Sequence, residues 1–324
     1  IGLDGKTSVN VKADGTVTTI TGTAANIQTV VSAATIDTAA NVNVTVDSGT
    51  ATVAQQIAID AQTTGTITAT IAEGDVSSLK TLTASGGVHA LTINISDTSA
   101  SASDLNTIDS KTSVNVNAGS ISLLTGTIAQ VQAAYTANTA GTITGLGDEA
   151  VTVTDVTLSS TDLNSLDLNT SGTITLSNAT TINVANGETL NLNNFTLSNS
   201  VTINDSTGNE NITGTSNSDT LNLNGGNDTV NLGEGSDTVN VNIGNIDTND
   251  NITDTGTSGT DTLNVNGTGT IDSASLIDVS GFETLNLGSG DNTITFDDTT
   301  EFSNFTSEFT NIVDAGGNDT LSFG

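Results

Sequence analysis

The stretch GGNDTVNLGEGSDTVNVN, residues 225–242, contains two copies of one nine-residue pattern. In each copy, glycines precede an aspartate, Asp228 or Asp237, and a Thr-Val pair follows it. The residues after each aspartate alternate between polar and apolar, which is typical of a β-strand with one buried face. The pattern therefore predicts a turn and a short strand in every nine residues, with one carboxylate where each strand begins.

The nine-residue period continues upstream, so that four acids recur at equal intervals: Glu210, Asp219, Asp228 and Asp237. Two nine-residue units would form one coil of two turns and two strands. Asp219 and Asp237 would then lie on one edge of a stack of coils, and Glu210 and Asp228 would lie on the opposite edge.

Stacked carboxylates repel one another, and this part of the chain has no lysine or arginine to offset them. Strands of neighbouring coils lie ~4.8 Å apart. Two unit charges at about that distance repel by roughly 0.8 kcal/mol in water and by about 3 kcal/mol at an effective dielectric constant of 20. A divalent cation between coils would reverse the sign of this interaction. Calcium fits best, because it accepts many oxygen ligands, backbone carbonyls included, in flexible geometry.

Glycines at the turns permit positive φ angles, which would bring turn carbonyls close to such an ion. The predicted metal residues are Asp219, Asp228, Asp237, Gly225, Gly226, Gly233, Gly235 and Asn227.

The composition favours a narrow β-structure over a wide globular core. The 324 residues include no Cys, Met, Pro or Trp, and only one Tyr and seven Phe. Thirty-six acids face four basic residues, and no lysine or arginine follows Lys111. This charge argues against nucleic acid or an anionic membrane surface as a partner and favours metal cations. No apolar run approaches the ~20 residues of a membrane helix, so membrane insertion is not expected.

Longer repeats occupy the first part of the chain. GKTSVNVKA at 5–13 returns as SKTSVNVNA at 110–118, a shift of 105 residues. Strand-like openings divide this interval into units of roughly 25 residues, each too small to close its own core. Apolar residues at helical spacing predict short helices between strands, with caps at Thr23, Thr127, Asp104 and Asp162. The prediction is an all-β fold, a parallel β-solenoid with short helical corners.

Residues 206–241 also resemble the nonapeptide repeats, G-G-x-G-x-D-x-U-x, of secreted bacterial RTX proteins. The resemblance implies a calcium-loaded parallel β-roll. Two departures are Thr215-Ser216-Asn217 in place of glycines and Glu210 in place of an aspartate. We predict three divisions: a solenoid of ~25-residue coils at 1–203, an RTX-like β-roll at 204–243, and an irregular RTX-like continuation with a Phe-rich end at 244–324.

The segment TANTAGTITGLGDEAVTVTDVTLSSTDLNSLDLNTSGTIT, residues 136–175, is similar to repeats of very large secreted surface proteins of marine bacteria, cyanobacteria included. This similarity extends over about residues 1–180. It implies an extracellular or cell-surface location and type I secretion, and it identifies no reaction.

No pattern indicates an enzyme. His89 is the only imidazole in a chain without cysteine, so a metal or nucleophilic site built on it has no second ligand or partner of that kind. We expect His89 at a corner of the solenoid, and we predict no enzymatic activity.

Rows of polar side chains on the outward faces suggest an alternative role. Thr-x-Thr pairs, such as Thr142/Thr144 and Thr173/Thr175, could form an ice-binding face, although the spacing between pairs is irregular. In the nine-residue region, Asn222, Asn231 and Asn240 are expected to stack in one row.

These features predict a structural extracellular repeat protein, a calcium-stabilised building block of a bacterial surface layer or filament. The alternative is an adhesin stalk, or a solenoid module that binds carbohydrate or ice. Both ends of the sequence fall inside a repeat, and exposed strand edges invite pairing. We therefore expect self-association into an oligomer, filament or lattice, or continuation into more repeats. A surface polysaccharide is a further candidate partner.

Overall fold

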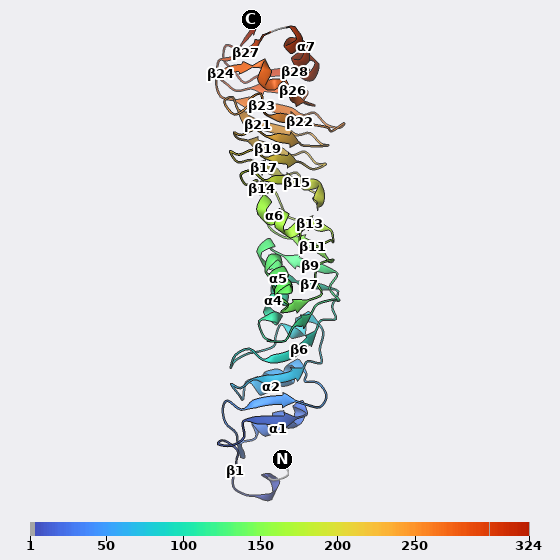
Figure 1. Cartoon of the computed structure of the whole chain (residues 1–324), viewed down its shortest axis with the longest axis vertical. Coiled ribbons are helices and arrows are strands. Elements are labelled where there is room, and N and C mark those ends of the chain that lie inside the picture. Colours follow the sequence, from blue (N-terminus) through green and yellow to red (C-terminus); the bar gives the residue numbers. More distant parts are fainter. Residues whose placement is uncertain (1–3, 298, 324) are drawn as a thin grey trace. The chain divides into compact units, whose positions relative to one another are not determined.

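A computed structural model describes residues 4–297 and 299–323 of the chain (Figure 1). The chain divides into two compact units, which are described separately. Unit 1 comprises residues 1–152 and 170–172, and unit 2 comprises residues 153–169 and 173–324. Within the described ranges, no helix combines the length and the apolar character of a membrane-spanning segment.

Unit 1 is built on a parallel sheet in which each coil adds one strand. The order is β10-β8-β6-β5-β4-β2, so the strands follow one another through the sheet as they do along the chain. Their bounds are β2 (Thr19–Gly22), β4 (Asn43–Val46), β5 (Ile67–Thr70), β6 (Ala90–Asn94), β8 (Val116–Asn117) and β10 (Ile143–Thr144). Shorter parallel pairs are β1 (Val11–Lys12) with β3 (Ile36–Asp37), and β7 (Ser99–Ser101) with β9 (Leu123–Gly126). Strand β11 (Ala150–Val153) and a 3-10 turn, η1 (Asp4–Lys6), complete the elements that begin in this unit.

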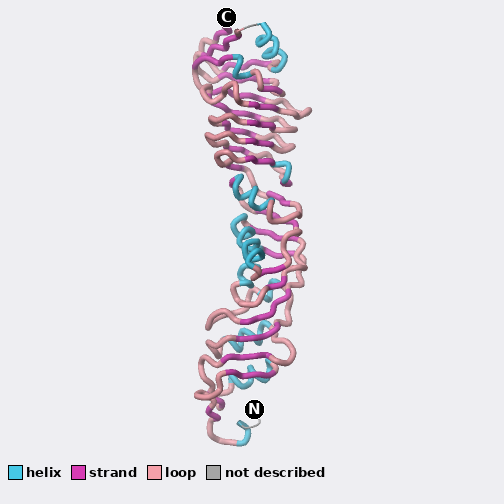
Figure 2. The backbone as a smooth tube through the Cα atoms, in the orientation of Figure 1, coloured by secondary structure: helices cyan, strands magenta, loops and turns pink. Residues whose placement is uncertain are grey.

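Helices occupy the corners between these strands (Figure 2). They are α1 (Ala24–Ser32), α2 (Val53–Asp60), α3 (Val76–Leu79), α4 (Ala102–Asp109) and α5 (Ile128–Ala140). Thr23 caps α1 and Thr127 caps α5, as predicted. The prediction of Asp104 as a cap was wrong, because the hydroxyl of Ser101 accepts the Asp104 N–H and caps α4. Asp104 lies instead in the first turn, where the helix dipole favours a negative charge.

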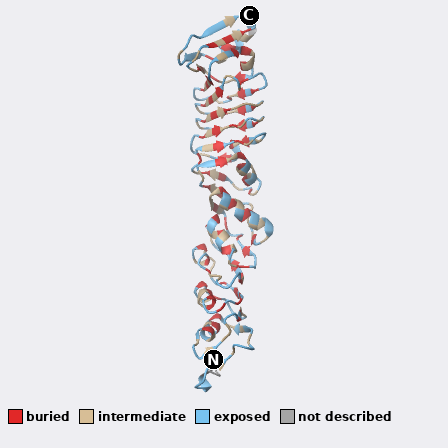
Figure 3. Ribbon diagram, turned by 90° about the vertical axis from the view of Figure 1, so that its left-hand side faces the viewer, coloured by how far each residue is buried: buried red, intermediate tan, exposed pale blue. Residues whose placement is uncertain are grey.

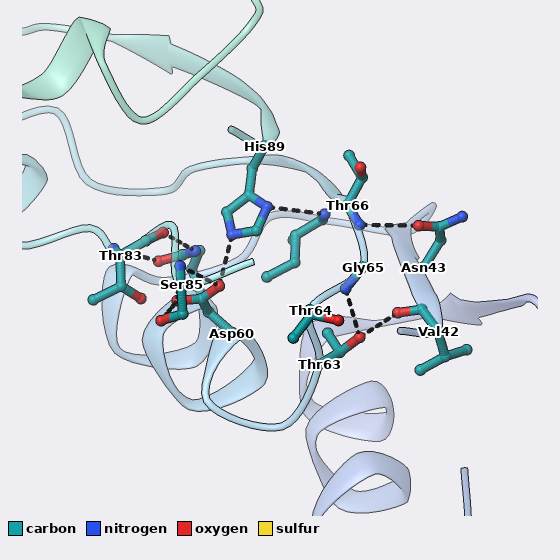
Figure 4. Close-up of polar contacts among 12 residues, drawn as sticks. Val42, Asn43, Asp60, Thr63, Thr64, Gly65, Thr66, Thr83, Ser85 and His89 are labelled. Atoms are coloured by element: carbon teal, nitrogen blue, oxygen red, sulfur yellow. Dashed lines mark hydrogen bonds and ion pairs between the residues drawn. The ribbon is translucent and has the colours of Figure 1, made fainter. Parts of the chain in front are cut away.

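A buried polar cluster joins neighbouring coils of unit 1 (Figure 4). His89 and Asp60 are 1% and 2% exposed, and His89 Nε2 lies 2.8 Å from Asp60 Oδ1. The Ile67 N–H donates to His89 Nδ1, so the hydrogen-bond network assigns the ring proton to Nε2. Ser85 donates both its N–H and its hydroxyl to Asp60. His89 therefore links three segments through its side chain in the interior of the solenoid.

Unit 2 is a stack of coils whose strands form two long parallel sheets (Figure 1). The first has the order β12-β14-β17-β19-β21-β23-β26-β28. Its strands are β12 (Thr157–Ser159), β14 (Thr181–Asn183), β17 (Thr202–Asn204), β19 (Thr220–Leu223), β21 (Thr238–Asn242), β23 (Thr262–Asn266), β26 (Thr284–Leu287) and β28 (Asn311–Asp314). The second comprises β15 (Thr189–Asn191), β18 (Asn211–Thr213), β20 (Thr229–Asn231), β22 (Asn251–Thr253) and β25 (Val279–Ser280).

Smaller elements complete unit 2. A third parallel sheet contains β24 (Gly269–Asp272), β27 (Asn292–Phe296) and β29 (Thr320–Phe323), and β13 (Ile174–Leu176) pairs with β16 (Phe195–Thr196). The helical elements are α6 (Ser160–Asp167), α7 (Thr299–Glu308), η2 (Leu192–Asn194) and η3 (Ser273–Leu276). Ser159 caps α6, so the prediction of Asp162 as a cap was also wrong.

The predicted fold class is confirmed: the chain is a parallel β-solenoid with helical corners. In most strands of both units the apolar residues point inward and their neighbours point outward, so buried and more exposed positions alternate along the strand (Figure 3). Thr202 pairs with Thr220 and Thr220 with Thr238, which confirms two nine-residue units per coil in this part of unit 2. The eight-stranded sheet continues across positions 203 and 243, and the three predicted divisions stay predictions.

One expected row is divided between the two sheets. Asn222 pairs with Asn240 on the eight-stranded sheet, whereas Asn231 lies on β20 of the five-stranded sheet. The reason is the coil length, because residues nine apart fall on opposite sheets and residues eighteen apart stack. The prediction that the three asparagines share a row was wrong for Asn231.

Phenylalanines close the core beside α7. Phe296, Phe305 and Phe309 are buried, and Phe296 contacts Phe302 and Phe305 edge to face at centroid separations of 5.3 and 5.2 Å. Phe302 and Phe305 belong to α7, and their helical spacing brings them to the same strand. This part of unit 2 therefore uses aromatic side chains where other coils use aliphatic ones.

Candidate metal centre

A ladder of carboxylates follows one edge of the eight-stranded sheet. Asp219, Asp237 and Asp261 each stand directly before a strand of that sheet. Asp237 Oδ1 accepts the N–H of Asp219 at 2.5 Å, and Asp261 Oδ1 accepts the N–H of Asp237 at 2.7 Å. Each acid thus ties its own coil to the preceding coil with a charge-assisted hydrogen bond.

A second ladder follows the corresponding edge of the five-stranded sheet. Asp228 Oδ1 accepts the N–H of Glu210 at 2.8 Å, and Asp250 Oδ1 accepts the N–H of Asp228 at 3.0 Å. Asp219 and Asp237 are therefore on one edge and Glu210 and Asp228 on the other, as the nine-residue period predicts.

The first candidate metal group combines Asp205, Glu210 and Asp228, all buried. One carboxylate oxygen from each lies within 4.8 Å of the others. Calcium–oxygen bonds of 2.3–2.6 Å place two ligands of one ion no more than about 5 Å apart. The spacing of the three oxygens is therefore compatible with a single calcium ion.

In this group, one carboxylate oxygen of each acid accepts a hydrogen bond from the backbone and the other does not. Asp205 Oδ2 accepts the N–H of Asn224, and Glu210 Oε1 accepts the N–H of Gly187. The remaining oxygens, Asp205 Oδ1, Glu210 Oε2 and Asp228 Oδ2, are buried and accept no hydrogen bond from an N–H or hydroxyl of the described residues. Three buried, unpaired carboxylate oxygens at one place are costly unless a cation or protons compensate them.

The second candidate metal group combines Asp237, Asp254 and Asp261, whose nearest oxygens also lie within 4.8 Å of one another. Asp254 Oδ1 accepts the N–H of Gly256, whereas Asp254 Oδ2 and Asp237 Oδ2 are buried without such a donor among the described residues. As in the first group, one oxygen of each acid accepts a backbone N–H, here Oδ1 of Asp237, Asp254 and Asp261.

The pKa values of these carboxyl groups reflect burial next to like charge. Burial is the largest cause, and it raises the pKa of Asp205 to about 7, of Asp228 to about 6 and of Asp237 to about 8. The neighbouring acid adds to the increase in each case: Glu210 for Asp205 and Asp228, and Asp254 for Asp237. Without a cation, Asp205, Asp228 and Asp237 therefore take up protons at a higher pH than ordinary aspartates do.

Turn glycines bring backbone carbonyls close to the acids. Gly226 has a φ of +146°, and a Cβ there would lie 1.4 Å from the carbonyl oxygen of Gly208 in the preceding coil and 3.3 Å from Asp228 Oδ1. The carbonyl oxygen of Gly233 would lie 2.1 Å from a Cβ at Gly256, which would also approach Asp254 Oδ1 to 3.0 Å. One carbonyl therefore lies near each candidate group.

The structure distributes the predicted metal residues unequally. Asp228 and Asp237 lie in different groups. Asp219 lies in neither, and both of its oxygens accept hydrogen bonds: Val201 donates to Oδ1, and Thr215 donates an N–H and a hydroxyl to Oδ2.

The predicted glycines and asparagine also differ in their positions. Gly226, Gly233 and Gly235 have positive φ angles and each closely approaches the preceding coil. Gly225 lacks such contacts, and the Asn227 side chain is exposed. The assignment of all eight residues as metal ligands stays a prediction.

Sequence reasoning missed Asp205, Asp254 and Asp261 as candidate ligands, and it placed Glu210 in the row of acids without predicting it as a ligand. Asp261 is followed by Thr-Leu-Asn, as Asp219 is, and this signal was available. Asp205 and Asp254 directly follow strands β17 and β22, a position that the nine-residue acid period does not mark.

Residues 205–239 match the family model of the RTX calcium-binding nonapeptide repeat, in four copies. RTX nonapeptide repeats bind Ca²⁺, and the two acidic groups are arranged so that they could hold such an ion. The first group lies wholly inside the matched segment, and the second begins inside it at Asp237 and extends beyond it. Comparison with curated proteins and with solved structures finds no match.

Proposed function

We propose that this chain is a calcium-stabilised structural segment of an extracellular bacterial protein that is exported by type I secretion. The observation that carries the proposal is the set of buried oxygens of Asp205, Glu210 and Asp228, which lack a donor within a segment that matches a calcium-binding repeat. RTX repeats are typical of proteins secreted by the type I route and are generally structural, calcium-binding and non-enzymatic.

Calcium acts here as a structural link between coils. Asp205, Glu210 and Asp228 would hold one ion, and Asp237, Asp254 and Asp261 a second. A ligand that binds only the folded state stabilises it by about 2.7 kcal/mol at one hundred times its dissociation constant. Folding of this segment would therefore depend on the calcium concentration around it.

The test is thermal unfolding during calcium titration of the whole chain, with the chelated protein as reference. Calcium should raise the unfolding temperature of the wild type, and Asp228→Asn should move the titration midpoint to at least about tenfold higher calcium. Asp278→Asn removes an exposed acid outside both groups and should leave the midpoint unchanged. An unfolding temperature that is equal with calcium and with chelator would refute the structural role.

We propose further that the segment assembles through homotypic contacts, as a surface layer or filament does. Strands β28 and β29 expose Ile312, Leu321 and Phe323 among the described residues, and either a second copy of this segment or further repeats of the same chain would cover these side chains. Exposed strand edges with apolar side chains favour pairing with another chain.

Light scattering during calcium titration tests assembly. Wild-type protein should grow in size as calcium is added and return to small particles with chelator. Ile312→Lys with Leu321→Lys should prevent the growth, while Val156→Lys, at another exposed apolar residue, should not. A wild-type protein that stays monomeric with calcium bound would favour the adhesin stalk instead.

A further inference from the structure

One outward face of unit 2 carries two uniform rows of side chains. Six consecutive strands of the eight-stranded sheet contain the sequence Thr-x-Asn, in which the middle residue is buried and apolar and the flanking side chains point outward. The six segments are residues 181–183, 202–204, 220–222, 238–240, 262–264 and 284–286. We call this surface the Thr/Asn face.

The rows are in register from coil to coil. Each threonine is the pairing partner of the next threonine, and each asparagine is the partner of the next asparagine. The asparagine amides form a continuous chain, in which Asn204 donates to Asn183, and the following members repeat the bond at 2.7–3.0 Å: Asn222, Asn240, Asn264 and Asn286.

This bonding fixes the orientation of every amide. An asparagine amide has two N–H donors and an oxygen with two acceptor positions. The chain of bonds uses one donor and one acceptor position, so the rest project from the face in a repeated direction. Threonine side chains are restricted at χ1 by β-branching. The face thus presents pre-organised hydroxyl and amide groups, ~4.8 Å apart across strands and about 6.7 Å apart along each strand.

The rows are not a by-product of the nine-residue repeat. Successive asparagines of the face are 21, 18, 18, 24 and 22 residues apart, yet Thr-x-Asn is kept at every step. On the five-stranded sheet, four strands of the same coils read Thr-Leu-Asn, Asn-Ile-Thr, Thr-Val-Asn and Asn-Ile-Thr. Threonine and asparagine are equally available there, but they alternate, so composition alone does not produce uniform rows.

The face is also uncharged and lacks aromatic side chains. None of its twelve outward positions holds an acid, although the chain has a net charge of −32. A neutral surface does not select ions or charged polymers, and without aromatic rings it offers sugar rings no stacking platform. The Thr/Asn face is therefore complementary to a neutral ligand whose own hydrogen-bond donors and acceptors form a rigid, periodic array.

We propose that the Thr/Asn face binds the surface of ice. Water in an ice crystal repeats donors and acceptors in fixed directions, and a face whose own groups are already fixed loses little conformational entropy on contact. This site differs from the Thr-x-Thr pairs considered from the sequence, because it lies on unit 2 and uses alternating threonine and asparagine rows. It requires folded, calcium-loaded coils but no assembly.

The test is partition of the calcium-loaded whole chain into slowly growing ice, together with inhibition of ice recrystallisation. Wild-type protein should be enriched in the ice fraction. Thr238→Tyr places a bulky ring in the middle of the threonine row and should lower this enrichment by about tenfold or more. Thr229→Tyr is the matched control, since Thr229 also follows a ladder aspartate and points outward, but from the five-stranded sheet.

Calcium-dependent unfolding of both variants checks that they fold. The proposal is supported if both variants retain the wild-type calcium response and only Thr238→Tyr loses its enrichment in the ice fraction. It is overturned if the wild type is excluded from ice, or if Thr229→Tyr loses as much retention as Thr238→Tyr. Retention on crystalline cellulose or chitin without retention in ice would also overturn it and would identify a polysaccharide surface as the occupant.

Discussion

Asp237 accepts the backbone N–H of Asp219 at 2.5 Å through Oδ1, while its Oδ2 is buried and accepts no hydrogen bond from the described residues. Asp219 occupies the same position one coil earlier, yet both of its oxygens accept hydrogen bonds from the protein. Asp237 and Asp219 thus occupy the same position in the repeat, but only Asp237 keeps an oxygen that can bind an ion. Substitutions at the two positions should therefore have different effects.

We expect Asp237→Asn to weaken calcium binding and Asp219→Asn to weaken the fold alone. Asparagine at 237 removes a charge from the second metal group, which should raise the calcium midpoint by at least about tenfold. Asparagine at 219 points an amide at donors of Thr215 or Val201, which should cost about 1–3 kcal/mol of unfolding free energy with or without calcium. Calorimetric calcium titration with denaturant unfolding measures both, and equal calcium defects in the two variants would contradict the assignment.

The metal-free protein should become less stable as the pH rises. The pKa values of Asp205, Asp228 and Asp237 are raised from 3.8 to about 7, 6 and 8, so the folded state holds protons that the unfolded chain releases. The contribution of these groups to stability is therefore greatest below about pH 4 and decreases as the pH rises to about 8. Unfolding of chelated protein at pH 5 and pH 8 measures it.

Calcium should reverse this dependence, because the ion requires ionised ligands. We expect proton release on binding and an affinity that increases between pH 6 and pH 8. Titration in two buffers of different ionisation enthalpy counts the protons. Calcium binding that is independent of pH in this range would show that these carboxyl groups are not ligands.

Gly226→Ala should destabilise unit 2 strongly, whereas Gly225→Ala should not. A Cβ at Gly226 would collide with the carbonyl of Gly208, and the φ of +146° is one that alanine rarely adopts. A Cβ at Gly225 would have no neighbouring atom closer than 3.6 Å, the distance to Asn245 Oδ1. We expect a loss of more than about 1 kcal/mol for the first change. Denaturant midpoints compare the pair, and similar losses would exclude the turn contact as the cause.

His89→Ala should destabilise unit 1 by about 1–3 kcal/mol, because it removes the imidazole N–H that donates a hydrogen bond to the buried Asp60 carboxylate. Thr92→Ala, at an exposed position of the adjacent strand, is the control. Hydrogen exchange of unit 1 amides measures the loss, and protection equal to that of the control would contradict the role of the pair.

Acid should affect this cluster in the direction opposite to the metal groups. Burial alone raises the pKa of Asp60, but the nearby Thr83 hydroxyl and the hydrogen bonds from Ser85 and His89 outweigh it and lower the pKa. The contribution of Asp60 to stability is therefore complete above the unfolded value of 3.8 and is lost as the pH falls through the folded pKa. Exchange at pH 6 and pH 3 would detect the loss in unit 1.

The sequence by itself determined the period and the side-chain alternation, and hence the parallel solenoid, the edges on which Asp219, Asp228 and Asp237 lie, and the choice of calcium. The solenoid and its edges follow from local geometry, since a strand alternates its faces every residue and two nine-residue units complete a coil. The choice of calcium follows from the repeated carboxylates that no lysine or arginine offsets. The helix caps at Thr23 and Thr127 could also be predicted, because each depends on a contact with a residue only three positions later.

Only the tertiary structure decided which oxygens are free to bind an ion. Asp205 and Asp254 join the metal groups from the ends of strands, and His89 meets Asp60 across 29 residues. The uniform Thr/Asn face likewise emerged only when coils of 18 to 24 residues were stacked, because their differing lengths conceal the register along the chain. The recurring residues are visible in the sequence, whereas the stacking of coils determines which hydrogen-bond donor contacts which acceptor.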